Sequence, residues 1–172
     1  GHEWGTNPCS EIILRPYQFC NLTEVVVRQG DDLENLRRKV RLATILGTAQ
    51  STFTKMPYLR KIWQKNTEEE RLLGVSLTGI MDNYLLSKTV DSKKWLKELK
   101  AQAIDVNRIY ADKLGVPASA AITCVKPSGT VSQLTDTASG IHARHSEYYI
   151  RTVRGDNKDP LTQFMKDSGI PA

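Results

Sequence analysis

An amide, a thiol and a carboxylate stand at alternate positions near the start of the chain, at Asn7, Cys9 and Glu11. In an extended or finger-like loop, alternate side chains point to the same side of the backbone. Pro8 fixes one φ angle between them and biases Asn7 toward an extended conformation. We therefore expect all three side chains to face one reactant.

A second thiol, Cys20, follows Cys9 by eleven residues, in a run with strand character. A free cysteine is most often a buried structural residue, but Cys9 lies between a proline and a serine in a loop, which is a poor core position. The alternative for Glu11 is a carboxylate at a strand edge, and for Asn7 an ordinary Asn-Pro turn. Cys124 precedes a loop on an apolar segment, and we interpret it as core packing.

A second candidate site is a short run of small and hydroxyl residues after that segment. Its glycine lets a backbone approach a ligand closely, its hydroxyls donate hydrogen bonds, and a following helix presents free N–H groups to a phosphate. Alone the run is also an ordinary turn and helix cap, and Lys126 before it could add positive charge. The residues of the run are Ser128, Gly129, Thr130, Val131 and Ser132.

Both candidate sites carry a family resemblance. The run NPCSE at residues 7–11, followed by FCNLTEV at 19–25, resembles the active-site finger loop and next strand of ribonucleotide reductases. The run CVKPSGTVSQL at 124–134 resembles that family's phosphate-binding loop, and SGIHARHS at 139–146 follows it. Within the family, this pairing is most similar to the adenosylcobalamin-dependent enzymes, called class II. Two motifs in the expected order are more specific than either alone.

The resemblance implies radical-based reduction of ribonucleotides to 2′-deoxyribonucleotides, the precursors of DNA. Cys9 would become a thiyl radical that takes the 3′ hydrogen of the ribose. Glu11 would act as general base on the 3′ hydroxyl, and Asn7 would hydrogen-bond the ribose hydroxyls. Cys20 would be one of a pair of reducing thiols that ends in a disulfide, with its partner on an earlier strand outside this chain. Residues 128–132 would bind the substrate's phosphates.

The resemblance also implies a cofactor and partners. Adenosylcobalamin would be the radical source, with its site largely outside this chain. The partners would be a ribonucleoside di- or triphosphate, a thioredoxin-like or other dithiol reductant, and the remainder of the reductase chain. No metal site is expected, because His142, Arg144 and His145 have no carboxylate or cysteine at ligand spacing nearby.

Composition limits the class of protein. A chain of 172 residues with 40% hydrophobic and 25% charged residues suits one globular domain. No apolar run is long enough to span a membrane, no signal peptide opens the chain, and three cysteines favour a reducing cytoplasm over a secreted disulfide framework. The net charge of +5 would fit a basic nucleic-acid-binding module. The basic residues are scattered, however, which favours solvated helix faces instead.

A second alternative is the large subunit of a class I reductase, which needs a separate radical-generating subunit. The KPSGTVS form of residues 126–132 makes this alternative less favoured. Class I enzymes pass a radical through a tyrosine pair, and this chain has Tyr148 and Tyr149. The pair follows residues 139–146 in the wrong context, so we interpret it as part of a strand with alternating aromatic residues.

The elements that must position these residues alternate between strands and helices, which predicts an α/β fold with parallel strands and crossover helices. The resemblance implies a single partial domain over 1–172: the middle-to-later part of a ten-stranded reductase α/β barrel, with the finger loop near its N-terminus. Both ends of the full domain would be missing, and the isolated fragment would be inactive. We expect a loop over 1–11, strands over 20–28, 71–80, 118–125 and 147–154, and helices over 33–50, 58–64, 81–86, 92–114, 130–134 and 160–168.

Overall fold

Two parallel strands form the centre of the structure, which is a computed structural model that describes residues 3–171. The strand β3 (Asn21–Val26) pairs with β4 (Leu73–Thr78) over the full length of both. Valine and threonine, which favour a pleated and half-buried surface, recur in both strands. The prediction of parallel strands is confirmed. The ten-stranded barrel is not seen within the described residues and stays a prediction.

The other edge of β4 is flanked by residues 121–124. The Val75 N–H donates to the Ile122 carbonyl at 2.8 Å, and the Cys124 N–H donates to the Val75 carbonyl at 3.1 Å. These contacts amount to a single parallel bridge. The strand predicted over 118–125 is therefore shorter than expected, but the order across the sheet is β3, then β4, then residues 121–124.

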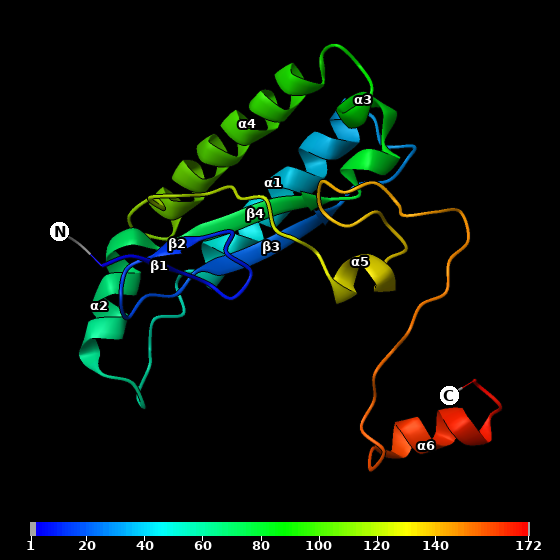
Figure 1. The fold of residues 1–172 in the computed structure, drawn as a ribbon. Helices are drawn as coiled ribbons and strands as arrows, with labels where there is room; N and C mark the ends of the chain where they lie inside the picture. Colours follow the sequence, from blue (N-terminus) through cyan, green and yellow to red (C-terminus); the bar gives the residue numbers. More distant parts are fainter. Residues whose placement is uncertain (1–2, 172) are drawn as a thin grey trace.

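Two long helices, α1 (Leu33–Gln50) and α4 (Ser92–Lys113), pack together beside these strands (Figure 1). Both were predicted from apolar residues at helical spacing. The Asp32 side chain caps α1 by accepting a hydrogen bond from the Asn35 N–H at 2.8 Å. The buried core that joins helices and strands consists of Val25, Val27, Leu36, Val40, Leu86, Leu99 and Ala103.

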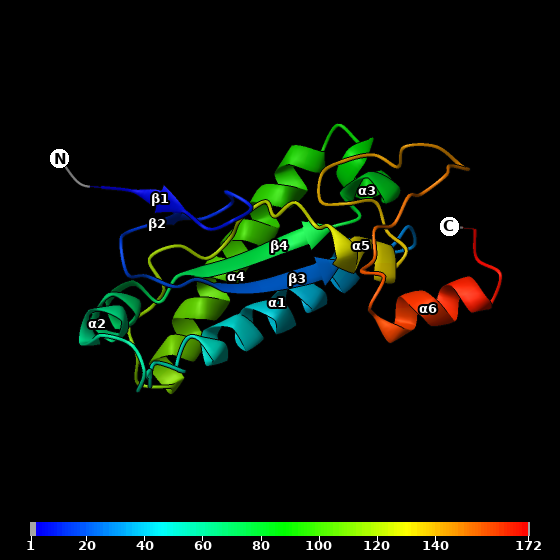
Figure 2. The same cartoon turned by 60° about the horizontal axis from the view of Figure 1, so that its bottom comes forward.

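The opposite face of the strands carries a small hairpin. Its strands β1 (Gly5–Thr6) and β2 (Ile13–Leu14) pair antiparallel, and Figure 2 shows them apart from α1 and α4. Buried Ile12 fixes the hairpin over Gly74. A Cβ at Gly74 would lie 3.1 Å from the Ile12 Cδ1 and only 2.4 Å from the Leu22 Cδ2. The hairpin can settle on the sheet because residue 74 has no side chain.

Shorter helices complete the described part of the chain. Asp159 caps the last of them by accepting a hydrogen bond from the Leu161 N–H at 2.9 Å, and Pro160 occupies the first turn. The helix predicted over 81–86 is divided into a 3-10 turn and a short α-helix. No helix within residues 3–171 is long and apolar enough to cross a membrane. The shorter helices are α2 (Lys61–Glu70), η1 (Ile80–Asp82), α3 (Tyr84–Ser87), α5 (Thr130–Leu134) and α6 (Pro160–Asp167).

Two predictions near α2 and the N-terminus are corrected. The helix predicted over 58–64 is misplaced, because α2 begins at Lys61 and continues to Glu70. It ends where Arg71 adopts a left-handed conformation (φ 44°) and its N–H donates to the Thr67 carbonyl at 2.8 Å. The loop predicted over 1–11 is partly wrong, because it contains β1.

The strand predicted over 147–154 is also wrong. These residues form no strand and are exposed, and Figure 1 shows this stretch leading away from the sheet toward α6. Alternating aromatic and β-branched residues such as Tyr148 and Val153 favour a strand only where a neighbouring strand can accept their hydrogen bonds. The sheets among the described residues pair β1 with β2 and β3 with β4, and residues 147–154 pair with none of these strands.

The close approach at Gly74 gives a first prediction. Gly74→Ala should lower the free energy of unfolding by about 1–3 kcal/mol, because the new methyl group meets the Leu22 side chain and forces the hairpin off the sheet. Thermal denaturation followed by circular dichroism measures this loss. Gly30→Ala is the matched control, since a Cβ there meets nothing within 4 Å. Equal melting temperatures for the two variants would contradict the account.

Candidate active site

The loop that carries the first candidate residues closes on itself. The Asn7 N–H donates to the Ile12 carbonyl at 3.2 Å, and the Ile12 N–H returns a bond to the Asn7 Oδ1 at 3.0 Å. Between them the Ser10 N–H donates to the Asn7 carbonyl at 2.9 Å, with Ser10 in a left-handed conformation (φ 63°). The loop is thus a tight turn and not an extended stretch with alternating side chains. We call residues 7–12 the finger loop.

Lys126 is the residue that the finger loop meets. Its Nζ lies 3.1 Å from the Glu11 Oε1 and 3.9 Å from the Cys9 Sγ. Sequence reasoning assigned Lys126 only a possible charge for a phosphate and missed this contact. Lys126 and Glu11 are 115 residues apart in the chain, so no local spacing signals their contact.

Glu11 is enclosed by the protein. Its side chain has no exposed surface, and its Oε2 has no hydrogen-bond partner among the described residues. Burial by itself raises the pKa of this carboxyl. Hydrogen bonds from its own backbone N–H, from the Asn7 side chain and from Lys126 outweigh burial and lower the pKa below its ordinary value. The result is a buried carboxylate with one oxygen left without a hydrogen-bond partner among the described residues.

Three free thiols lie around this carboxylate, in different environments. Cys9 is exposed, whereas Cys20 and Cys124 are half-buried. Burial and then the negative charge of Glu11 raise the pKa of the Cys20 thiol. The same two causes, with Cys20 nearby, raise the pKa of the Cys124 thiol to about 11. Cys20 and Cys124 therefore stay protonated at neutral pH, as thiols that can give up hydrogen.

Cys20 and Cys124 are not positioned to form a disulfide with each other. Cys20 directly precedes β3, and Cys124 lies beyond β4 on the far side of the sheet order. Neighbouring strands are about 4.7–4.9 Å apart, so two spacings place the Cα atoms about 9 Å apart or more. A disulfide needs Cα atoms within about 7 Å. The interpretation of Cys124 as simple core packing is incomplete, because its Sγ lies on the finger-loop face, 3.0 Å from where a Gly74 Cβ would be.

Glu24 is a further residue that sequence reasoning missed. It stands on β3 four residues after Cys20, and alternation puts both on the face that the finger loop covers. Its Oε1 is buried without a hydrogen-bond partner among the described residues, and its charge contributes to the raised pKa of Lys126. The signal that could have found it is this alternation along the strand.

The phosphate candidate forms the start of α5. The Ser132 Oγ donates its hydrogen within the loop, to the Ser128 carbonyl at 2.9 Å and the Gly129 carbonyl at 2.7 Å. That hydrogen is therefore already used in a bond inside the loop. Ser128 is buried, and its own Oγ has no partner among the described residues. Thr130 and Val131 are exposed, and a Cβ at Gly129 would meet nothing within 4 Å. The role of these residues in binding phosphate stays a prediction.

The basic residues after α5 have a structural task. Arg144 pairs with Asp82 at 3.0 Å and with Asp136 at 2.8 Å, which fixes the segment after α5 to η1. Within residues 3–171, no group of three or more His, Cys, Asp or Glu side chains is arranged to hold a metal ion. Tyr149, part of the predicted strand, instead donates its hydroxyl hydrogen to the Gln133 Oε1 at 3.2 Å.

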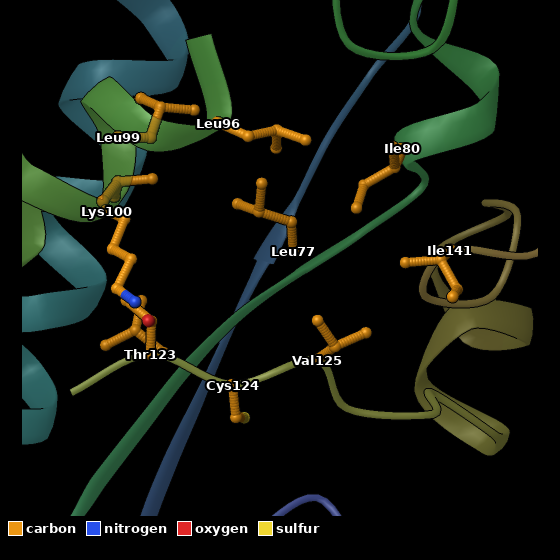
Figure 3. Close-up of a pocket in the computed structure, with 11 residues that line it drawn as sticks. Leu77, Ile80, Leu96, Leu99, Lys100, Thr123, Cys124, Val125 and Ile141 are labelled. Atoms are coloured by element: carbon orange, nitrogen blue, oxygen red, sulfur yellow. The ribbon is translucent and has the colours of Figure 1, made fainter. Parts of the chain in front are cut away.

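An apolar cavity of about 240 Å³ lies on the other side of β4, beside α4 (Figure 3). Leu77, Leu96 and Val125 are among its walls, and the Cys124 side chain points away from Leu77 and Val125. None of Asn7, Cys9, Glu11 and Cys20 lines the cavity. The chemistry-bearing residues therefore gather on the finger-loop face and not in this cavity.

Comparison with known proteins supports the motif-based resemblance. No family model matches the chain. It is 33% identical to an adenosylcobalamin-dependent ribonucleoside-triphosphate reductase of Lactobacillus gasseri, over 98% of this chain and 26% of the relative. The same reductase of Lactobacillus acidophilus is 32% identical, over 96% of this chain and 25% of the relative. The chain thus spans about a quarter of the length of the curated relatives it matches.

The comparison with solved structures points to the same family. The crystal structure of a B12-dependent (class II) ribonucleotide reductase matches with a TM-score of 0.68 at 28% sequence identity, over 82% of this chain and 23% of that one. The described residues are therefore a mixed α/β fragment that matches part of a class II structure. The resemblance inferred from the two motifs is confirmed.

The environments of the thiols give a second prediction. Iodoacetamide at pH 8 should alkylate Cys9 first and Cys124 most slowly, because only Cys9 is exposed and because burial keeps Cys124 protonated. Mass spectrometry of peptides taken at successive times measures the order. In denaturant the three rates should become similar. Alkylation of Cys124 as fast as Cys9 in the folded chain would be inconsistent with this geometry.

Proposed function

We propose that this chain, which is homologous over most of its length to adenosylcobalamin-dependent (class II) ribonucleotide reductases, is the middle-to-later part of a reductase catalytic barrel. The proposed activity is radical-based reduction of ribonucleotides to 2′-deoxyribonucleotides. One observation carries the proposal beyond homology: a buried carboxylate with a free oxygen, Glu11, on the same tight loop as an exposed thiol, Cys9.

The proposed steps divide the work among three residues. A thiyl radical on Cys9 takes the 3′ hydrogen atom of the ribose, and the Glu11 Oε2 accepts the proton of the 3′ hydroxyl. The 2′ hydroxyl then leaves as water, using a proton from the reducing thiols. Cys20 and a partner thiol outside this chain supply two electrons and two protons and become a disulfide: one proton enters the leaving water, the other hydrogen goes to C2′, and Glu11 returns its proton to the 3′ oxygen. Cys9 finally returns its hydrogen to C3′ and is a radical again.

Asn7 has a supporting role in this scheme. Its Oδ1 is occupied by the Ile12 N–H, so its amide N–H groups remain for Glu11 and for a ribose hydroxyl. The same side chain thus fixes the shape of the finger loop and hydrogen-bonds the substrate. Asn7 and Glu11 together would hold the 3′ hydroxyl beside the Cys9 sulfur.

Adenosylcobalamin, when bound, would supply the radical that first removes hydrogen from Cys9. The chain fits this cofactor at one point: Cys9 and its neighbours Pro8 and Ser10 are exposed, which leaves the thiol open to a large group. The finger loop would be the part of this chain that the cofactor approaches. The remaining contacts would come from the rest of the reductase.

The substrate would be a ribonucleoside di- or triphosphate. The curated relatives are named ribonucleoside-triphosphate reductases, so a triphosphate is the substrate of first choice. Its phosphates would approach residues 128–132, where the backbone at Gly129 is open to a ligand. The disulfide formed at Cys20 would be reduced by a thioredoxin-like or other dithiol.

The test uses the full-length protein that contains this segment. It is given adenosylcobalamin, a ribonucleoside triphosphate and a dithiol, and deoxynucleotide is measured by chromatography. Cys9→Ala should abolish product, because the radical site is lost, and Cys20→Ser should stop reduction by the dithiol. Cys124→Ser is the matched control and should keep most activity, because it removes a thiol that the scheme does not use.

Other outcomes would change the assignment. Product that requires a separate radical-generating subunit, and not cobalamin, would identify a class I large subunit. An active Cys9→Ala variant would overturn the radical role of Cys9. Absence of product under both conditions would leave the shared fold without the activity. The 172-residue chain alone should be inactive, and sustained product from it would contradict the proposal that it is a part.

A further inference from the structure

We propose that Lys126 is a positioning residue of this site: it keeps the Glu11 side chain charged and in place, and so prepares it to act as the base. The inference rests on the proposed function. Its basis is the contact of the Lys126 Nζ with the Glu11 Oε1 at 3.1 Å, while the Oε2 of the same carboxylate stays free.

A buried carboxylate needs such a partner. Without a nearby positive charge, a carboxyl group removed from water takes up a proton and becomes neutral. A protonated Glu11 could not accept the proton of a substrate hydroxyl. Lys126 itself stays charged in this environment: burial lowers its pKa, but the hydrogen bond and charge of Glu11 outweigh burial and raise it.

The other groups around Glu11 do not supply this charge. Asn7 offers a neutral hydrogen bond, and the thiols of Cys20 and Cys124 are neutral at pH 7. Glu24, on β3, adds a second negative charge near Lys126. Among the described residues, Lys126 is the one cation hydrogen-bonded to the Glu11 carboxylate.

The backbone of Lys126 lies close to Gly140, which is itself bonded to the sheet. A Cβ at Gly140, which is left-handed (φ 53°), would lie 2.8 Å from the Lys126 carbonyl oxygen. The Gly140 N–H in turn donates to the Thr78 Oγ1 at 2.9 Å, at the end of β4. The ammonium group therefore reaches the finger loop from a segment that is packed against the sheet.

The same segment leads directly into the phosphate candidate, since Ser128 lies two residues further on. Lys126 thus connects the loop that would hold the phosphates to the loop that would act on the ribose. Its ammonium points to Glu11 and toward Cys9, so its charge serves the base and not the phosphates. This separates Lys126 from an ordinary phosphate-binding lysine, whose loss raises the KM.

The first test measures Glu11 directly in the full-length protein that contains this segment, by carbon-13 NMR titration of labelled glutamate. Lys126→Met should raise the pKa of Glu11, because the positive charge that favours the carboxylate is removed. Lys126→Arg should leave that pKa below its ordinary value. Lys100→Met, which changes a lysine beside the apolar cavity instead, is the matched control and should leave Glu11 unchanged. The melting temperature of each variant checks that it is folded.

The second test measures turnover in the full-length protein. At neutral pH, Lys126→Met should lower kcat by about 10- to 100-fold, part of the usual contribution of a general base. The KM for the nucleotide should change little. The loss should shrink as pH rises, because the more weakly acidic Glu11 then ionises again, and Lys126→Arg should restore most activity. A purely structural role would not move the pH profile in this way.

Three results decide the matter. An unchanged pKa of Glu11 in Lys126→Met would overturn the proposal, and so would a raised KM with an unchanged kcat, the signature of a phosphate ligand. A raised pKa of Glu11 in a protein without reductase activity would support the part played by Lys126 while rejecting the proposed function. The two ideas can therefore fail separately.

Discussion

The burial of one carboxylate against one ammonium group is the constraint on which the rest of the site depends. The Glu11 side chain has no exposed surface, and its charge is tolerated because hydrogen bonds from its own backbone N–H and from Asn7, together with Lys126, offset the cost of leaving water. The contact requires the finger loop to lie close to the sheet, which Gly74 permits, and it places Lys126 beside Gly140, where a side chain at residue 140 would not fit. Two glycines far from each other in sequence thus serve one ion pair.

The sequence predicts structural elements correctly where the signal lies within a short stretch of the chain. Apolar spacing and an Asp cap predict α1, and the same spacing predicts α4. The finger loop was recognised from five consecutive residues, 7–11. In contrast, the strand predicted over 147–154 is absent, because a strand depends on a neighbour that these residues do not have in the described structure. The end of α2 was not predicted, because nothing about an arginine side chain indicates the left-handed conformation that Arg71 adopts.

In the candidate site too, local features were predicted from the sequence and long-range contacts were not. Asn7, Cys9 and Glu11 were expected together and lie on one loop, but a tight turn at Ser10 brings them together instead of the alternation of an extended chain. Lys126 was assigned to a different task, since nothing in a linear sequence links it to a residue 115 positions away. Motifs indicate candidate residues, whereas the contacts that these residues make emerge only from the packing of distant segments.

The order of the strands limits where the redox partner of Cys20 could lie in a reductase of the proposed kind. Among the described residues β3 pairs only with β4, and the thiol beyond β4 is too distant for a disulfide. Under the proposed function, a reducing partner for Cys20 on a neighbouring strand would therefore lie along the edge of β3 that is unpaired among the described residues. In each turnover the new disulfide would link two adjacent strands covalently, and the reductant would break that link. A covalent bond across the edge of the sheet would then form and break once for each nucleotide reduced.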